Sequence, residues 1–234
     1  MTTIDLVLVP GLLCTGELFR EQLAGLADVA RMQVADHGGA ETIGEVARAI
    51  LSAAPERFAL CGLSMGGYVA LEIMRQQPAR VQRLALLDTA ATPDSPQQTE
   101  ARLARIALAR EGRLDEIAAQ LWPVFVHPSR VGDMALRARY DAMVAATGAE
   151  RFVRQMRAIM SRPDSRPHLQ AIAKKTLVLV GEADRVTPPA EAQTIANGIA
   201  FAELVVVAGC GHLSTMERPE AVNAALRAWL TAPE

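Results

Sequence analysis

The chain lacks several features that identify whole classes of protein. Its three cysteines show no Cys-x-x-Cys spacing, which excludes a disulfide framework and a cysteine-rich zinc site. No apolar run approaches the roughly 20 residues of a membrane span, and a net charge of −2 gives no basic field for nucleic acid. P-loop and HExxH motifs are also absent. We therefore expect no nucleic-acid partner, no membrane partner, no metal and no cofactor.

The beginning of the chain also lacks the basic residues of a signal peptide, and Asp5 interrupts its apolar stretch. Together with the few cysteines, this predicts a cytoplasmic protein. The chain has 234 residues, half of them hydrophobic, which is typical of one large globular domain or of a domain with an insertion.

Six short runs rich in valine, leucine and isoleucine predict β-strands. The runs do not alternate between apolar and polar residues, as expected for strands buried on both faces. Helical patterns separate most of them, and such alternation predicts a parallel sheet with helices on both faces. The runs cover residues 4–9, 29–35, 57–61, 84–87, 176–180 and 203–207.

The alternation breaks for nearly ninety residues between Leu87 and Thr176, where no strand pattern occurs. Helical patterns separated by prolines fill this segment. We predict a helical cap at residues 93–168, inserted into a core formed by residues 1–92 and 169–234. Such an insertion is expected over the carboxyl ends of the strands, where ligands bind in open α/β sheets. The predicted cap helices cover residues 97–110, 114–121, 133–146 and 149–160.

The segment Gly62-Leu-Ser-Met-Gly66 lies between a predicted strand and an amphipathic helix. The pattern G-x-S-x-G in this context is typical of a strained turn that projects a serine above a sheet. Glycines on either side allow the strand and the helix to approach each other closely. The helix N-terminus leaves the Met65 N–H free for a developing oxyanion. Ser64 is therefore the candidate nucleophile, and the alternative is a serine that only caps the helix.

A serine nucleophile needs a histidine base. Among the four histidines, only His212 directly follows a predicted buried strand, at the same sheet edge as Ser64. We interpret His37, His127 and His168 as solvated loop residues.

The histidine in turn needs a carboxylate to orient it. Asp184 follows the strand at 176–180, and it gives the order serine, aspartate, histidine along the chain, which is the α/β-hydrolase order. Asp88 follows the strand at 84–87 and remains an alternative, although it could be a turn carboxylate; Asp36 is a weaker candidate. The second oxyanion donor is predicted to be the N–H of Leu12, in the loop after the first strand. The predicted substrate-binding residues are Leu13, Trp122, Phe125, Met156 and Leu213.

The segments GLSMGG, GEADRVTPP and GCGHLSTMERPEAVNAALRAWL resemble the α/β-hydrolase fold superfamily, in particular its small capped serine esterases and lipase-like hydrolases. The resemblance covers nearly the whole chain and is poor only in the cap. It implies an α/β fold with about six mostly parallel strands, helices on both faces and a helical cap insertion. It also implies a nucleophile, an acid, a base and two oxyanion-hole amides, at Ser64, Asp184, His212, Leu12 and Met65 respectively.

Two features depart from that family. Its members commonly have His-Gly after the first core strand, where this chain has Pro10-Gly11. They often begin with an antiparallel hairpin, whereas this chain begins at the core strand, which suggests a trimmed sheet.

The resemblance implies a carboxylesterase-like enzyme that cleaves carboxylic esters through an acyl-enzyme. The alternatives with the same triad are a carbon–carbon bond hydrolase and a cofactor-free haloperoxidase or perhydrolase. A non-catalytic ligand-binding protein of this fold would usually lack part of the triad. Haloalkane dehalogenases and epoxide hydrolases of this fold use an aspartate nucleophile, so Ser64 argues against them.

The predicted cap is rich in arginine. Residues 93–168 hold twelve arginines against nine acidic residues, whereas the rest of the chain is acidic. Two interpretations are open: a solvated helix face, or a surface that attracts an anionic or carrier-bound acyl substrate. The clearest groups are Arg137 and Arg139, and Arg151, Arg154 and Arg157.

Overall fold

The computed structural model describes residues 3–233, and its six strands form one parallel sheet in the order β2-β1-β3-β4-β5-β6. This confirms the predicted α/β-hydrolase architecture. The strands are β1 (Ile4–Val9), β2 (Ala30–Val34), β3 (Phe58–Leu63), β4 (Val81–Leu87), β5 (Thr176–Gly181) and β6 (Ala202–Val207).

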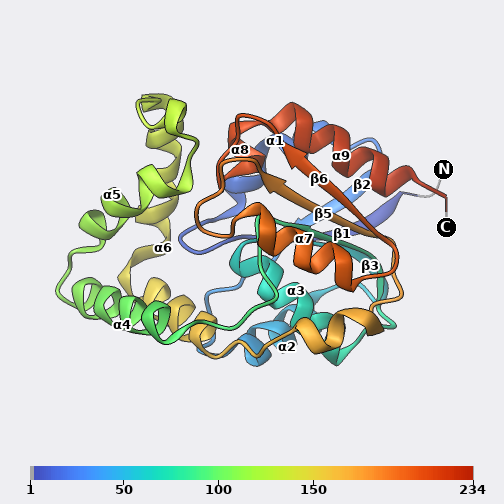
Figure 1. Ribbon diagram of the computed structural model, residues 1–234, viewed down its shortest axis with the longest axis horizontal. Coiled ribbons are helices and arrows are strands. Elements are labelled where there is room, and N and C mark those ends of the chain that lie inside the picture. Colours follow the sequence, from blue (N-terminus) through green and yellow to red (C-terminus); the bar gives the residue numbers. More distant parts are fainter. Residues whose placement is uncertain (1–2, 234) are drawn as a thin grey trace.

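Helices cover both faces of the sheet (Figure 1). One face carries α1 (Arg20–Gly25), the short α8 (Ser214–Glu217) and α9 (Pro219–Thr231), and the other carries α2 (Ile43–Ala53), α3 (Met65–Gln76) and α7 (Pro189–Gly198). The 3-10 helices η1 (Gly16–Phe19), η2 (Pro128–Arg130) and η3 (Arg166–Ala171) complete the set in the described part of the chain.

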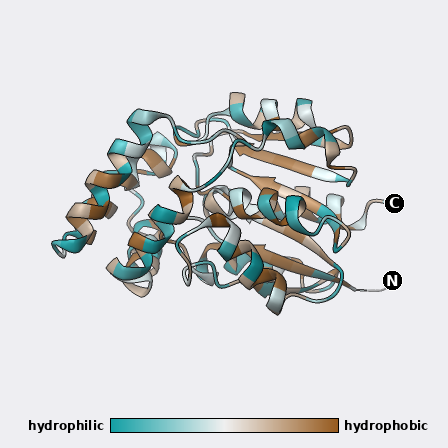
Figure 2. Ribbon diagram, turned by 90° about the horizontal axis from the view of Figure 1, so that it is seen from below, coloured by the Kyte–Doolittle hydropathy of each residue, from teal (hydrophilic) through white to brown (hydrophobic). Residues whose placement is uncertain are grey.

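The central strands form the hydrophobic core, and Figure 2 shows them as mostly hydrophobic ribbons between helices with mixed colouring. Every residue of β3 and β5 is buried, because helices cover both of their faces. The prediction that all six strands are buried on both faces is wrong for the two edge strands. Both β2 and β6 are only partly buried, and Val206 is half exposed. An edge strand has a neighbour on one side only, and the helices cover it less completely.

A helical insertion lies over the carboxyl ends of the strands (Figure 1). It contains α4 (Pro96–Arg110), α5 (Leu114–Phe125) and α6 (Met134–Met160). Ser95 begins α4 with a capping box that it shares with Gln98. The backbone of α6 leaves the helical conformation at Gly148, with φ 68°, which agrees with the two helices predicted on either side of this position. No helix within residues 3–233 is both long and apolar enough to cross a membrane.

Candidate active site

Ser64 lies on a sharp turn between β3 and α3, with φ 56° and ψ −115°, a backbone conformation that non-glycine residues rarely adopt. The two flanking glycines make this turn possible. A Cβ on Gly62 would lie 2.1 Å from the Gly66 carbonyl oxygen, and a Cβ on Gly66 would lie 1.9 Å from the Val9 carbonyl oxygen. The G-x-S-x-G spacing therefore follows from backbone segments that pack directly against each other around the serine.

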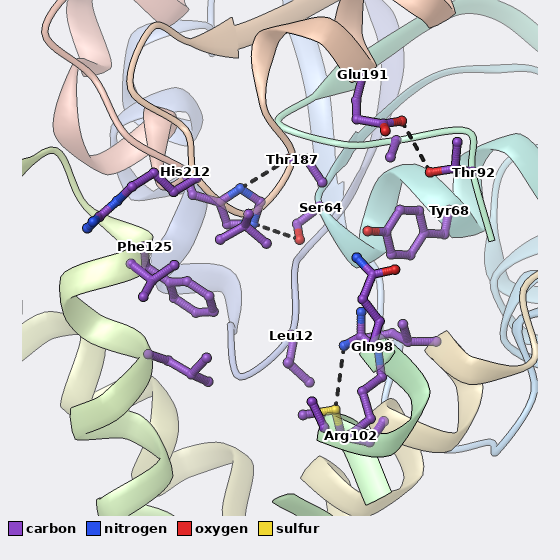
Figure 3. A pocket seen from close by; sticks show the side chains of 18 of the residues that line it. Leu12, Ser64, Tyr68, Thr92, Gln98, Arg102, Phe125, Thr187, Glu191 and His212 are labelled. Atoms are coloured by element: carbon purple, nitrogen blue, oxygen red, sulfur yellow. Dashed lines mark hydrogen bonds between the residues drawn. The ribbon is translucent and has the colours of Figure 1, made fainter. Parts of the chain in front are cut away.

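Three residues from separate loops form one hydrogen-bonded chain. The Nε2 atom of His212 lies 2.8 Å from the Ser64 Oγ, and its Nδ1 atom lies 2.8 Å from the Asp184 Oδ2 (Figure 3 shows the first of these contacts). Asp184 also accepts hydrogen bonds from the Val186 and Thr187 amides and from the Thr187 hydroxyl. All three members of the chain are buried. The structure thus brings together the three residues that the sequence singled out.

The electrostatics of these three hydrogen-bonded residues favour an ionised Asp184 beside a basic His212. Burial by itself would raise the pKa of Asp184, but the charge and hydrogen bond of His212 and the loop amides lower it below the ordinary value. Burial would lower the pKa of His212, but the carboxylate of Asp184 outweighs this and raises it above 6.5.

Asp88, the alternative acid, has a different environment. It is fully buried, its φ is 44°, and it accepts hydrogen bonds from the Gly181 amide and from the Ser214 hydroxyl. Burial raises the pKa of Asp88 well above its usual range. The structure therefore places Asp184, not Asp88, in hydrogen-bond contact with His212. Asp36 is exposed and pairs with Arg151.

The two predicted oxyanion donors flank the serine. Met65 is the first residue of α3, and Leu12 lies in the loop after β1, facing the same pocket as Ser64 (Figure 3). A Cβ on Gly11 would lie 3.3 Å from the Ser64 Cβ, so this loop passes close to the serine. In the described part of the chain, neither amide donates to a backbone acceptor of a turn or loop. Both N–H groups thus remain candidates to bind an oxyanion.

A buried glutamine from the insertion holds the loop that carries Leu12. Gln155 of α6 accepts the Leu13 amide hydrogen bond at 3.2 Å, and its Nε2 lies 3.0 Å from the His37 Nε2. That His37 nitrogen also lies 2.9 Å from the Gly11 carbonyl oxygen. His37 is therefore buried, and its interpretation as a solvated loop residue was wrong. Burial lowers the pKa of His37 to about 4, so its ring is neutral at neutral pH.

We predict that Gln155→Leu lowers kcat for an ester by about 10- to 100-fold, because a small misplacement of a positioned donor has effects of this size. The variant leaves the Leu13 N–H buried and without an acceptor, which also costs about 1–3 kcal/mol of stability. Thr147→Val is the matched control, because Thr147 is buried in the same helix and bonds only to the Met143 carbonyl among the described groups. Steady-state kinetics and thermal melts would test this prediction, and an unchanged kcat in Gln155→Leu would contradict it.

Another buried side chain joins the insertion to the histidine loop. Glu217 accepts hydrogen bonds from the amides of His127 and Gly211, at 2.7 and 2.9 Å. The Phe125 carbonyl accepts a further bond from the His212 amide, at 2.8 Å. The end of α5 is therefore fixed against the loop that carries the histidine. No local sequence pattern indicates this role of Glu217, because the residue lies in an ordinary helical stretch.

A pocket of about 440 Å³ opens above Ser64 and His212. Of the predicted substrate-binding residues, the structure places Phe125 and Met156 in its wall. Leu13, Trp122 and Leu213 are buried but lie outside the lining. Trp122, for example, donates to the Val131 carbonyl and packs on Tyr140. The larger apolar side chains of the lining include Leu12, Leu121, Val124, Phe125, Met156 and Ile159.

The arginines singled out from the sequence do not line this pocket; they bind acidic side chains or backbone groups. Arg137 pairs with Asp141 within α6. The others connect the insertion to the core: Arg139 binds Glu17 and Glu21, Arg151 binds Asp36, Arg154 binds the Gly38 carbonyl and Arg157 binds Glu41. Their positions support a role in holding the insertion in place.

The three cysteines are buried and form no disulfide with one another. Cys14, Cys61 and Cys210 are free and buried, and burial raises the pKa of each thiol. Within the residues that the structure describes, no group of three or more histidine, cysteine or acidic side chains could hold a metal ion.

Comparison with known proteins agrees with this architecture. Residues 6–225 match the alpha/beta hydrolase family. The chain is 31% identical to a 2-hydroxy-6-oxononadienedioate/2-hydroxy-6-oxononatrienedioate hydrolase of Paraburkholderia xenovorans, over 72% of this chain and 60% of that protein. It is 32% identical to 3-oxoadipate enol-lactonase 2 of Acinetobacter baylyi, over 72% of this chain and 61% of that protein. The matches thus span about three fifths of the length of these two relatives.

A solved structure resembles the whole chain. A thermophilic esterase from Thermogutta terrifontis, with malate bound, superposes with a TM-score of 0.90 at 31% identity, covering 98% of this chain and 90% of that one. The fold, the family match and these relatives lead to one conclusion: the chain belongs to the alpha/beta hydrolase family.

Proposed function

We propose that this hydrolase cleaves carboxylic esters through an acyl-enzyme, with Ser64 as nucleophile, His212 as base and Asp184 as the acid that orients it. The observation that carries the proposal is the continuous hydrogen-bonded chain from Ser64 to Asp184 at the floor of a pocket. A protein that only binds ligands has no need of all three groups in this arrangement.

The geometry supports a two-step acyl transfer. His212 takes the Ser64 proton as the hydroxyl oxygen attacks the ester carbonyl, and Asp184 stabilises the imidazolium that forms. The amides of Leu12 and Met65 bind the negative oxygen of the tetrahedral intermediate. His212 then returns the proton to the departing alcohol, which leaves an acyl group on Ser64. Water activated by His212 releases the acid and restores the serine.

In this proposal residues 93–168 act as a cap on a core of residues 1–92 and 169–234. Phe125 and Met156 contact the substrate directly, whereas Leu13, Trp122 and Leu213 act through the packing behind the pocket wall. A cytoplasmic location, a small-molecule ester as the only partner, and the absence of nucleic-acid and membrane partners remain predictions.

A carbon–carbon bond hydrolase is the second candidate, and the oxononadienedioate hydrolase among the relatives favours it. The triad would be the same, so the substrate distinguishes the two activities. A cofactor-free haloperoxidase or perhydrolase would also keep the triad, but it would need peroxide as a co-substrate.

The test is a screen of p-nitrophenyl esters of increasing acyl length, run with and without a serine-directed phosphonate. Ester hydrolysis that the phosphonate abolishes supports the proposal. Cleavage of a vinylogous 1,5-diketone with no turnover of any ester would favour the carbon–carbon hydrolase. Peracid formation from acetate and peroxide, again without ester turnover, would favour the perhydrolase.

The pH dependence of kcat/KM is expected to show one acid limb. His212 must be neutral to act as base, so activity falls as pH falls through its pKa. Because Asp184 raises that pKa above 6.5, the limb should lie above this value. The measurement is kcat/KM from about pH 5 to about pH 9. A slow ester is used because the chemical step then limits the rate. A flat profile would argue against a histidine base.

A further inference from the structure

One wall of the pocket carries an excess of positive charge. Gln98, Arg102 and Arg105 lie on the face of α4 that lines the pocket, at spacings of four and three residues. Arg162, from the segment after α6, lines the same pocket, and so does Arg185. Glu191 is the acidic residue of the lining, and it accepts a hydrogen bond from the Thr92 hydroxyl (Figure 3).

Two of these arginines share one acidic partner. Asp94 is buried between Arg102 and Arg162; it accepts from Arg102 at 2.6 Å and lies 2.7 Å from the Arg162 guanidinium. Arg162 is further fixed by the Thr92 carbonyl and by the Tyr68 ring, whose centroid lies 4.3 Å away. Both oxygens of Asp94 therefore contact these two partners, and its single negative charge offsets only one of their two positive charges.

Arg185 donates to the Pro123 carbonyl, so Arg105 is the lining arginine left without a partner among the described residues. It is half buried, and no ion pair or hydrogen bond joins its guanidinium to any group in residues 3–233. Burial and the neighbouring charge of Arg102 lower the pKa of Arg105. A guanidinium that is partly removed from water without a partner is costly, and a carboxylate matches its planar fork with two parallel hydrogen bonds.

We propose that Arg105 binds a free carboxylate on the substrate, so that the preferred substrates are esters or lactones that carry a second, ionised carboxyl group. This inference rests on the proposed ester hydrolysis at Ser64 and names the class of substrate for that site. The carboxylate binds on the α4 wall while the scissile carbonyl lies at Ser64, both within one pocket of about 440 Å³.

Binding to a variant that cannot turn over tests this separately from activity. In a Ser64→Ala background, isothermal titration calorimetry compares the monomethyl and dimethyl esters of glutaric, adipic and pimelic acid. At least one monoester is expected to bind about 10- to 100-fold more tightly than its neutral diester, as for a hydrogen bond between charged groups. Arg105→Gln should abolish this preference. Arg110→Gln removes an exposed arginine of the same helix, outside the catalytic pocket, and should keep it.

The outcomes separate this inference from the proposed function. Equal binding of monoesters and diesters, no binding of any monoester, or a preference that survives Arg105→Gln would overturn the assignment of Arg105. A charge preference that depends on Arg105, in a wild-type protein that hydrolyses no ester, would support the carboxylate site and contradict ester hydrolysis. In a protein that retains Ser64, Arg105→Gln should lower kcat/KM for the monoester by 10-fold or more. The kcat/KM for the diester should change much less.

Discussion

Replacing Ser64 with alanine is expected to reduce kcat for ester hydrolysis by about 10⁵- to 10⁶-fold, because removal of a triad nucleophile alone has effects of this size in serine hydrolases. The Ser64 side chain bonds to His212, while its backbone carbonyl keeps the bond from the Thr89 hydroxyl in the variant. The turn is formed by the glycines around the serine, so the melting temperature should change little. Hydrolysis of p-nitrophenyl acetate, followed together with a thermal melt, is the measurement.

Ser52→Ala provides the matched control. Ser52 is exposed on α2 and bonds to the Ala49 carbonyl, so the same chemical change there should leave kcat unaltered. If a folded Ser64→Ala protein keeps more than about a hundredth of the wild-type kcat, the role of Ser64 is contradicted.

Asp184→Asn is expected to lower kcat by about 10⁴-fold, by analogy with the same change in a serine protease. The Asp184 Oδ1 accepts two backbone amides, so the carbonyl of an asparagine would occupy that place. Its NH₂ group would then face the Nδ1 atom of His212, where the carboxylate oxygen now accepts at 2.8 Å. This favours the tautomer with the proton on Nε2, which cannot accept a proton from Ser64. The measurement is kcat across the pH range, with circular dichroism to verify the fold.

Asp88→Asn is the comparison that assigns the acid. Asparagine tolerates the positive φ at this position and can still accept the Gly181 amide. Ser214 can reverse its hydroxyl to accept from the new NH₂ group. A loss of at most about tenfold is expected, the equivalent of one hydrogen bond. A larger loss at Asp88 than at Asp184 would reverse the assignment.

The parts of the site that could be predicted are those that local chain patterns encode. The turn around Ser64 is fixed by glycines two residues away on either side, so the five-residue pattern between a strand and a helix is enough to recognise it. Asp184 follows the buried strand β5 and His212 follows the edge strand β6, and parallel strands bring such loops to one sheet edge. The order of the three residues along the chain then identified the fold.

The parts that could not be predicted depend on pairs of residues far apart in the sequence. Gln155 contacts Leu13 and His37, which lie more than 100 residues earlier, and no sequence pattern predicts those contacts. The partners of the arginine clusters singled out from the sequence were also unpredictable. These arginines bind acidic side chains and a backbone carbonyl, and most of those partners lie in the core, far away in the sequence. Arg105, which has no partner within residues 3–233, has no distinctive sequence context. Exposure of the edge strands was missed because composition does not reveal where in a sheet a strand lies.

Trapping the acyl-enzyme tests the central proposal most directly. The enzyme is mixed with a p-nitrophenyl ester, quenched in acid during turnover, digested with protease and examined by mass spectrometry. The account predicts an added acyl mass on the peptide that contains Ser64, and no such adduct in the Ser64→Ala variant. Turnover of the ester with no acylated peptide, or with the acyl group on another residue, would contradict it.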